Sequence, residues 1–417
     1  LRLIYCTERL RQGGEFIVNI AKWTIMIYAN GNNDLEPEMW QAKLATKTLR
    51  ADRSVNVVLL LGREEPALVR MLRPGQDAHG TDDQWTGVRS YVLTEEGWVL
   101  LADWGKENMA DPCCLYKFVN ATLASFPAER NMLIFGGHGY QFVGSMPDYS
   151  QADPCIMGYP AMVRALERAC FEHHSQIDLL IGDVCYFNFV EVIFEFASHA
   201  DHVVKHVLTY ICDGPIRGMP YDRIIRQTQT DSDCLGVRDL IKNMIKEMEL
   251  DLVAFVLEYN QLAGIKQAFH QLAECYIRHK AEYPAQIHEI LFVSDYGCPW
   301  FRQAQAALAG LEELIIDYKR SSTNDYGLLN IANVPTENRK AGILYSKLQF
   351  THGNAWTQLL HGSADLHSDV QNSENDWKPI ILAPEEIFAY ISLMNGKLTR
   401  PQKLAIFNEV ANYKNWF

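Results

Sequence analysis

The most informative feature of the sequence is a pair of short apolar runs. Each run is followed within three positions by a residue that can take part in nucleophilic catalysis. Residues 131–137 (NMLIFGG) run into His138, and residues 177–182 (IDLLIG) are followed within three positions by Cys185. Both runs are typical of buried strands, and a helix-like stretch separates them. Because parallel strands joined by a crossover helix end at the same edge of a sheet, we expect the imidazole and the thiol to lie close together. A thiol beside a histidine is the minimum apparatus of a cysteine nucleophile.

Each of these residues also has a purely structural interpretation. Most free cysteines are small buried apolar residues, and Cys185 fits that description. His138 fits a turn residue at a strand end, and His-Gly occurs elsewhere in the chain, at His79, His352 and His361. The ten cysteines are scattered without any Cys-x-x-Cys pair, so the sequence suggests neither a zinc site nor a disulfide framework.

Composition excludes several classes of function. The 417 residues are 48% hydrophobic and include no stretch long enough to span a membrane. A net charge of -13 argues against nucleic-acid binding, which needs a basic surface. Residues 1–19 contain no long apolar core, so they do not read as a secretory signal, and a cytoplasmic location is slightly favoured over secretion.

Strand and helix patterns alternate through the first half of the chain, which predicts a mostly parallel sheet covered on both faces. The expected strands are 23–30, 55–61, the run that ends at His138, the run before Cys185, and 202–210. Helices are expected to begin after residue 34 and over 115–123, 162–170 and 187–197, and residues 69–72 and 88–92 are expected to pair as a hairpin. The second half is mainly helical in pattern, at 240–257, 304–318, 384–393 and 401–413, with a polar linker at 363–376.

Several segments together, in order and spacing, resemble the clostripain family of cysteine peptidases, which groups with caspases, legumains and gingipains. The likeness is good from about residue 22 to 230 and sparse beyond. The matching segments are 22–28 (KWTIMIY), 33–36 (NDLE), 107–112 (ENMADP), 126–128 (FPA), 133–135 (LIF), 138–139 (HG), 183–185 (DVC), 190–192 (VEV), 200–204 (ADHVV), 213–214 (DG) and 218–221 (GMPY). Val184, Tyr186 and Phe187 are bulkier than the family pattern, and residues 140–142 (YQF) replace a Gly-rich stretch.

The resemblance implies a caspase-like α/β fold with a helical C-terminal addition. It divides the chain into an N-terminal extension at 1–21, a catalytic core at 22–230, a mainly helical second part of the peptidase unit at 231–362, and a linker with a helical cap at 363–417. It also implies a His138–Cys185 dyad without a required acidic third member. We expect the helix that follows Cys185 to favour its thiolate. The backbone N–H groups of Gly139 and Cys185 are the expected oxyanion donors.

Two carboxylates are candidates for substrate binding. Asp183 lies two positions before Cys185, and alternate residues of a strand share a face, so its carboxylate is expected in the pocket for the residue before the scissile bond. The resemblance implies that this position binds a basic side chain and that Asp213 forms a second acidic wall. Helix capping is the alternative for Asp183 and an Asp-Gly turn the alternative for Asp213.

These residues predict an endopeptidase that cleaves protein or peptide substrates after Arg, less often Lys. The alternative is a catalytically silent relative that serves as a regulatory or binding module. A nucleotide-binding protein is disfavoured because no phosphate-binding Gly loop follows the first strand. The chemistry needs no cofactor. The resemblance allows a Ca²⁺ ion at an unlocated site and a regulatory protein partner, while Asn32, Asn33 and Asp34 are interpreted as a helix cap.

Overall fold

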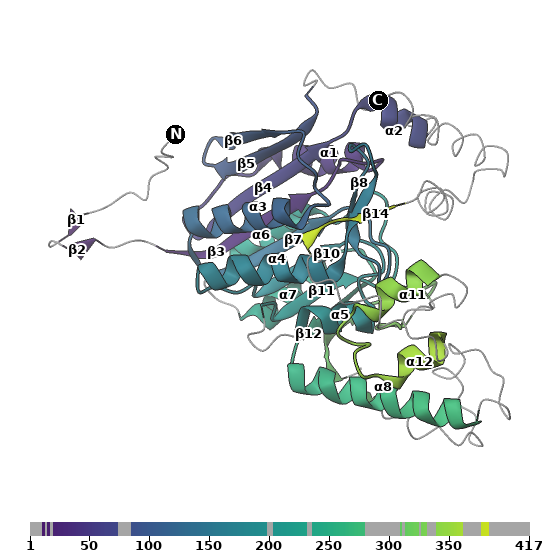
Figure 1. Ribbon diagram of the computed structural model, residues 1–417. Helices are drawn as coiled ribbons and strands as arrows, with labels where there is room; N and C mark the ends of the chain where they lie inside the picture. The colour runs from purple at the N-terminus through teal and green to yellow at the C-terminus, as the bar shows by residue number, and fades with distance from the viewer. Residues whose placement is uncertain are drawn as a thin grey trace.

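A nine-stranded sheet forms the centre of the molecule (Figure 1). The computed structural model describes residues 11–12, 15–16, 20–73, 85–197, 203–231, 236–279, 309–310, 313–324, 327–331, 339–361 and 377–382. In spatial order the strands are β13 (Ile315–Lys319), β12 (Leu252–Val256), β11 (His206–Tyr210), β10 (Leu179–Asp183), β7 (Ala128–Gly136), β3 (Ala21–Ala29), β4 (Val55–Arg63), β5 (Gly87–Thr94) and β6 (Gly97–Gly105). The five from β11 to β4 pair in parallel, and the outer strands pair antiparallel. The predicted mostly parallel α/β fold is therefore confirmed.

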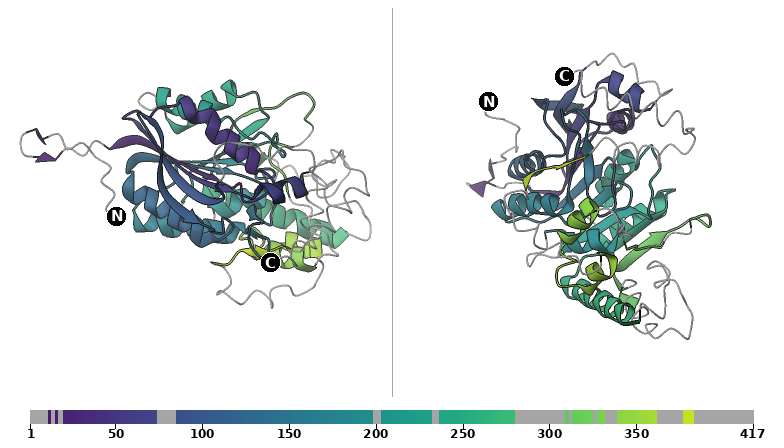
Figure 2. Two further views of the ribbon diagram at one scale, coloured as in Figure 1. Left: turned by 90° about the horizontal axis from the view of Figure 1, so that it is seen from above. Right: turned by 45° about the vertical axis from the view of Figure 1, so that its right-hand side comes forward.

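Helices cover both faces of this sheet (Figure 2). One face carries α1 (Glu36–Ala45), α6 (Tyr221–Asp231) and α7 (Val237–Glu247), and the other carries α3 (Pro112–Ser125), α4 (Tyr159–Glu172), α5 (Val190–Ala197) and α8 (Tyr259–His279). The smaller elements are α2 (Pro66–Leu72), η1 (Thr46–Thr48), α11 (Arg339–Ser346), α12 (Ala355–His361), a pair of β1 (Arg11–Gln12) with β2 (Glu15–Phe16), and a three-stranded sheet of β14 (Ile380–Ile381), β9 (Cys155–Met157) and β8 (Ser145–Asp148).

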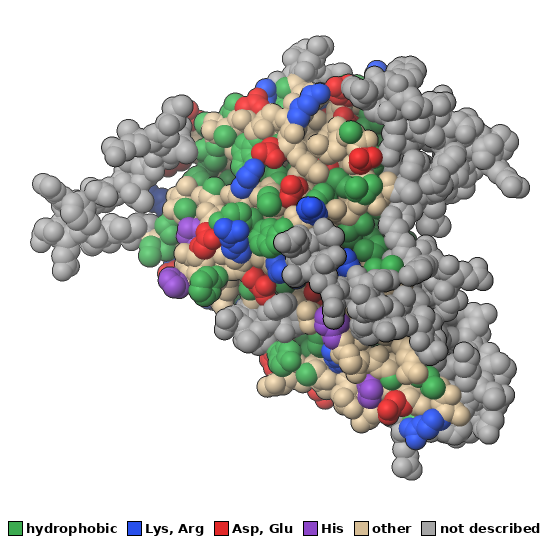
Figure 3. All heavy atoms as spheres, viewed as in Figure 1, with side chains coloured by type: hydrophobic (Ala, Val, Ile, Leu, Met, Phe, Trp, Pro, Cys, Tyr) green, Lys and Arg blue, Asp and Glu red, His purple; other side chains and the backbone are tan. Residues whose placement is uncertain are grey.

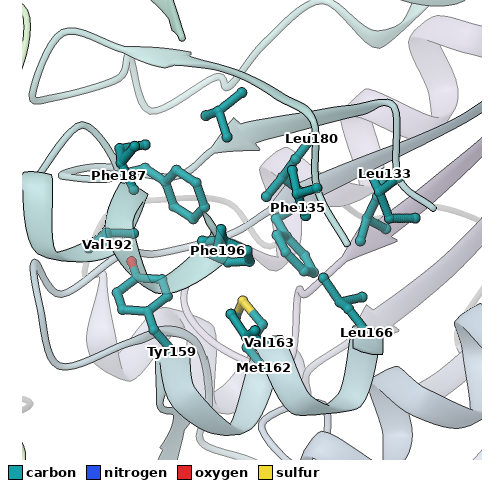
Figure 4. Close-up of a cluster of buried hydrophobic side chains, with 14 of the residues drawn as sticks. Leu133, Phe135, Tyr159, Met162, Val163, Leu166, Leu180, Phe187, Val192 and Phe196 are labelled. Atoms are coloured by element: carbon teal, nitrogen blue, oxygen red, sulfur yellow. The ribbon is translucent and has the colours of Figure 1, made fainter. Parts of the chain in front are cut away.

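Strand side chains alternate between two hydrophobic cores, one on each face of the sheet. In β3, Trp23, Ile25 and Ile27 pack with the α1 side, and Met26 and Tyr28 pack with the α3 side. Figure 4 shows part of the second core, in which Phe135 and Leu180 of neighbouring strands face side chains of α4 and α5. These strands are buried on both faces, so the edge at which they end is held rigidly.

One predicted hairpin is wrong. Residues 69–72 lie in helix α2, and the antiparallel partner of β5 is β6 rather than this segment. Pro66 stands at the start of the helix, where its fixed φ is favourable, and the buried Leu68, Val69 and Leu72 follow helical spacing.

Two predicted helices also give way to strands. The helix expected over 240–257 ends at Glu247, and residues 252–256 form β12. The helix expected over 304–318 overlaps β13, which begins at Ile315. Short apolar runs fit either period, and here pairing between distant segments decides for strand. The predicted helices at 384–393 and 401–413 and the linker at 363–376 lie outside the described residues.

The surface fits the composition. On the described part of the face in Figure 3, acidic and basic side chains are interspersed rather than gathered in a field of one sign. Within the described ranges, no helix has both the length and the apolarity that a bilayer span requires.

Candidate active site

The ends of β7 and β10 form the edge at which His138 and Cys185 lie. The two strands pair in parallel with Gly136 opposite Asp183, and the Gly137 N–H donates to the Asp183 carbonyl at 3.2 Å. A side chain at Gly139 would collide with the Cys185 carbonyl, so glycine is needed where these two segments meet. His138, Asp183 and Cys185 line one pocket. The structure thus brings the expected dyad and oxyanion residues to one edge.

Cys185 is a protonated thiol in this arrangement. Only 8% of the residue is exposed, and the Gly214 N–H donates to its Sγ at 3.4 Å. Burial, followed by the nearby carboxylates of Asp213 and Asp183, raises the pKa of the thiol to about 12. We expected a helix to begin directly after the nucleophile, but α5 begins only at Val190. Because a helix dipole acts within its first turn, this helix is too far along the chain to supply the expected thiolate stabilisation.

His138 is held by a carboxylate that the sequence did not assign to it. Its Nε2 lies 3.0 Å from Oδ1 of Asp34, and both residues are buried. Burial alone would raise the pKa of Asp34, but His138, followed by Arg73, holds that pKa below its ordinary value. An ionised carboxylate only accepts hydrogen bonds, so Nε2 carries the proton and Nδ1 is the unprotonated nitrogen of the neutral ring.

The predicted cap role of Asp34 is therefore wrong. Leu35 occupies the N-cap position of α1 without a side-chain bond, and Asn33 Oδ1 accepts from the Leu35 N–H at 2.9 Å. The position of Asp34 in the sequence could have indicated its contact with His138. Asp34 follows β3, the parallel neighbour of β7, so it emerges at the same sheet edge as His138.

Asp183 lies at the pocket wall with both carboxylate oxygens engaged. Oδ1 accepts from the Tyr210 hydroxyl at 2.6 Å and from the Met219 N–H at 3.0 Å, and Oδ2 accepts from the Tyr221 hydroxyl at 2.8 Å. Burial raises the pKa of Asp183 against these bonds, which lower it. These partners lie on β11, the loop after it and α6, so the carboxylate does not cap the next helix.

Asp213 does not join Asp183 in the pocket. It is exposed, lies outside the pocket lining, and its carboxylate contacts the Tyr186 side chain. Burial, followed by Asp213, raises the pKa of the Tyr186 hydroxyl. The arrangement brings Asp213 beside the nucleophile segment rather than to a second acidic wall.

The pocket itself is small. Its volume is about 20 Å³, enough for about one water molecule. Leu35 and Met39 contribute apolar wall, and Pro215, Ile216 and Gly218 contribute the loop that covers it. Gly218 has a φ of +70°, and a Cβ there would lie 2.8 Å from Asp183 Oδ2. A volume of this size does not admit a basic side chain, so we expect substrate entry to displace part of the lining.

The resemblance allows a calcium ion at an unlocated site. Within the described residues, no three His, Cys, Asp or Glu side chains gather in a group able to hold a metal ion. No step is therefore assigned to Ca²⁺, and the ion allowed by the resemblance stays a prediction.

Comparison with known proteins agrees with this fold. A sequence model of the clostripain family matches residues 49–377. Among solved structures, an inactive zymogen C11 protease from Parabacteroides distasonis has a TM-score of 0.55 at 14% identity, covering 80% of this chain and 98% of its own. A secreted C11 cysteine protease from Bacteroides thetaiotaomicron, in complex with an irreversible peptide inhibitor, has a TM-score of 0.52 at 12% identity. The match covers 73% of this chain and 86% of that one. A second secreted C11 protease from that organism, iotapain, has a TM-score of 0.53 at 11% identity. The match covers 81% of this chain and 99% of that one.

No curated protein sequence matches this chain. The preference for a cytoplasmic location is corrected by the comparison, because two of these similar structures are of secreted proteases. The family match spans most of the sequence and the sheet agrees with the C11 structures. This chain belongs to the clostripain family and is a cysteine peptidase.

Proposed function

We propose that the chain is an active endopeptidase in which Cys185 is the nucleophile and His138 the proton carrier, and that it cleaves after Arg, less often after Lys. The observation that carries this proposal is one pocket lined by a thiol, an imidazole and a buried carboxylate. The first two groups supply covalent catalysis, and the third supplies a negative charge for a basic side chain.

The reaction begins with transfer of the Cys185 proton to Nδ1 of His138 and attack of Sγ on the substrate carbonyl carbon. The backbone N–H groups of Gly139 and Cys185 donate to the oxygen that becomes negative. Collapse breaks the C–N bond, and His138 returns the proton to the leaving amine. A water molecule then gives a proton to His138 and attacks the thioester, which releases the acid and restores the thiol.

Asp183 keeps one place for a substrate cation. A carboxylate has about four acceptor sites, and Tyr210, Met219 and Tyr221 use three of them. The remaining site is on Oδ2, the oxygen that faces Gly218 and the pocket loop. Apolar walls at Leu35 and Met39 suit the aliphatic part of a long basic side chain. The preference for Arg over Lys rests on the weaker hydration of the guanidinium group.

Two observations favour the alternative of a silent relative. The thiol has a pKa of about 12 and the pocket admits about one water molecule, so this conformation is not ready to react. We attribute both features to a closed pocket loop that a substrate opens, since entry of a cation beside Asp183 would offset the nearby negative charge.

A peptide electrophile with Arg at the position next to the warhead separates the two functions. We expect stoichiometric labelling of wild-type protein at Cys185, mapped by mass spectrometry to exclude the neighbouring Cys212, and no labelling of Cys185→Ala. The same peptide ending in Asp should label far more slowly. Wild-type protein that resists the Arg electrophile and leaves every member of a fluorogenic peptide panel uncut would be a silent relative.

A further inference from the structure

We infer that Asp34 is a positioning residue for His138, so that catalysis uses a Cys185–His138–Asp34 arrangement rather than the expected dyad. This inference rests on the proposed peptidase function. The observation behind it is the 3.0 Å contact between Asp34 Oδ1 and His138 Nε2, in which the two residues are 5% and 2% exposed. A buried imidazole with one nitrogen committed to a carboxylate has only one tautomer available when neutral.

The loop that carries Asp34 is held in place without its side chain. Asn30 and Asn33 each donate a side-chain N–H to the Pro147 carbonyl at 2.9 Å, and the Tyr149 N–H donates to the Asn32 carbonyl at 2.8 Å. These bonds attach the loop after β3 to the β8 segment. Because other residues fix the loop, the Asp34 carboxylate is presented to His138 in advance of substrate binding.

Arg73 also holds Asp34 in place. Its Nη1 donates to the Asp34 backbone carbonyl at 2.9 Å and to Glu38 at 2.7 Å. The guanidinium thus holds the backbone of Asp34 and adds positive charge that keeps the carboxylate ionised. Within the described residues, His138 is the side chain that bonds the Asp34 carboxylate. The carboxylate is therefore placed to act on the imidazole.

Its chemical effect follows from the mechanism. When His138 accepts the Cys185 proton it becomes an imidazolium ion inside a buried site, and a negative charge 3.0 Å from Nε2 stabilises that ion. The same contact keeps Nδ1 unprotonated before the reaction, as the acceptor that the thiol needs. In the serine-protease triad, replacing the corresponding aspartate by asparagine lowers kcat by about 10⁴-fold through the wrong tautomer. We expect a loss of about 10²- to 10⁴-fold here.

The test compares Asp34→Asn with Asp178→Asn. Asp178 is also a buried carboxylate, accepting from the Asn131 N–H at 2.9 Å and from the Gln176 side chain at 3.0 Å, but it precedes β10 at the end away from the site and takes no part in the loop network. Asp34→Asn should lower kcat by at least about 100-fold with KM changed less than about threefold. Asp178→Asn should keep kcat within about threefold. Comparable kcat losses in the two variants, or an Asp34→Asn protein with more than half of wild-type kcat, would overturn the inference.

A measurement on wild-type protein needs no variant to fold. Imidazole ¹⁵N NMR, recorded at a pH high enough for the ring to be neutral, should find the single ring proton of His138 on Nε2, and a neutral ring with its proton on Nδ1 would contradict the assignment. This readout separates the two claims. An inactive wild type with the Nε2–H tautomer would contradict the peptidase function alone, and an active wild type that tolerates Asp34→Asn would contradict the positioning role alone.

Discussion

Replacing Asp183 by asparagine removes a negative charge from the pocket while every neighbour keeps a partner. Oδ1 accepts from both Tyr210 and Met219, whereas Oδ2, among the described residues, accepts only from Tyr221. The asparagine oxygen can retain the first two bonds, and its amide can donate to the Tyr221 hydroxyl oxygen. The fold should therefore survive, and the loss should fall on substrates that carry a positive charge.

The size of the expected loss in kcat/KM follows from the burial of Asp183. Removing one partner of a buried ion pair costs about 3–5 kcal/mol, because the other charge is left uncompensated. Only one acceptor site of Asp183 remains for substrate, so we take the lower part of this range. At about 1.4 kcal/mol for each factor of ten, kcat/KM for Arg peptides should fall by about 10²- to 10³-fold.

Arginine and citrulline peptides give the sharpest assay, because the two side chains have nearly the same shape and differ in charge. Wild-type protein should prefer the Arg peptide by about 10²-fold or more, and Asp183→Asn should bring the two rates within about threefold. Tyr221→Phe keeps the charge and should keep the preference. Asp178→Asn, at the opposite end of the same strand segment, controls for loss of a buried carboxylate. An Arg preference that survives in Asp183→Asn would refute the pocket assignment.

The same variant predicts a pH-dependent gain in stability. Burial raises the pKa of Asp183 in the folded protein. A carboxyl group with a raised folded pKa favours folding when it is protonated, below its ordinary pKa, and this contribution is lost as the pH rises through the folded value. At neutral pH the unliganded wild type therefore carries a cost that Asp183→Asn lacks. Thermal unfolding should show an equal or higher Tm for the variant at pH 7.5, and a smaller difference near pH 4.

Three further outcomes are expected. Cys185→Ala and His138→Ala should each lower peptide hydrolysis to background, and Cys185→Ala should change the free energy of unfolding by less than about 2 kcal/mol; substantial turnover by Cys185→Ala would disprove the nucleophile. Residues 140–163 contain no Lys or Arg, so active wild-type protein should remain one chain; intact-mass fragments split between 139 and 185 that are absent from Cys185→Ala would contradict this. Gly218→Ala should destabilise by about 1–2 kcal/mol and lower kcat/KM at least about tenfold, since its Cβ would press on Asp183 at a φ of +70°. Gly353→Ala, at a φ of +66° in open space, is the matched control and should leave kinetics unchanged.

Local pattern was enough to predict the central strands and the crossover helix. The runs that became β7 and β10 are continuously apolar because parallel strands in this sheet are buried on both faces. Met162, Val163 and Leu166 follow the helical period because one face of α4 packs on the sheet. With the right-handed crossover rule, these facts place His138 and Cys185 at one edge without further information.

Hydrophobic periodicity gave the wrong prediction where pairing with another segment decides between helix and strand. Residues 252–256 are apolar at both the helical and the strand period, and pairing with β11 makes them a strand. Residues 69–72 alternate well enough for a hairpin, yet Pro66 begins a helix there and β6 takes the place beside β5. Short runs carry too little periodicity to exclude either state.

The sequence by itself determined which reactive residues follow neighbouring strands. Buried strands can be predicted from short apolar runs, and the residues that follow them can be read directly from the chain. Tertiary structure decided how those groups are charged and what they touch. Asp34 reaches His138 across 104 positions of sequence, Asp213 turns to Tyr186 instead of Asp183, and the pocket loop leaves room for about one water molecule. The raised pKa values of Cys185 and Asp183 arise chiefly from burial by segments from many parts of the chain. Protonation and pairing are properties of the packed site, so no local pattern contains them.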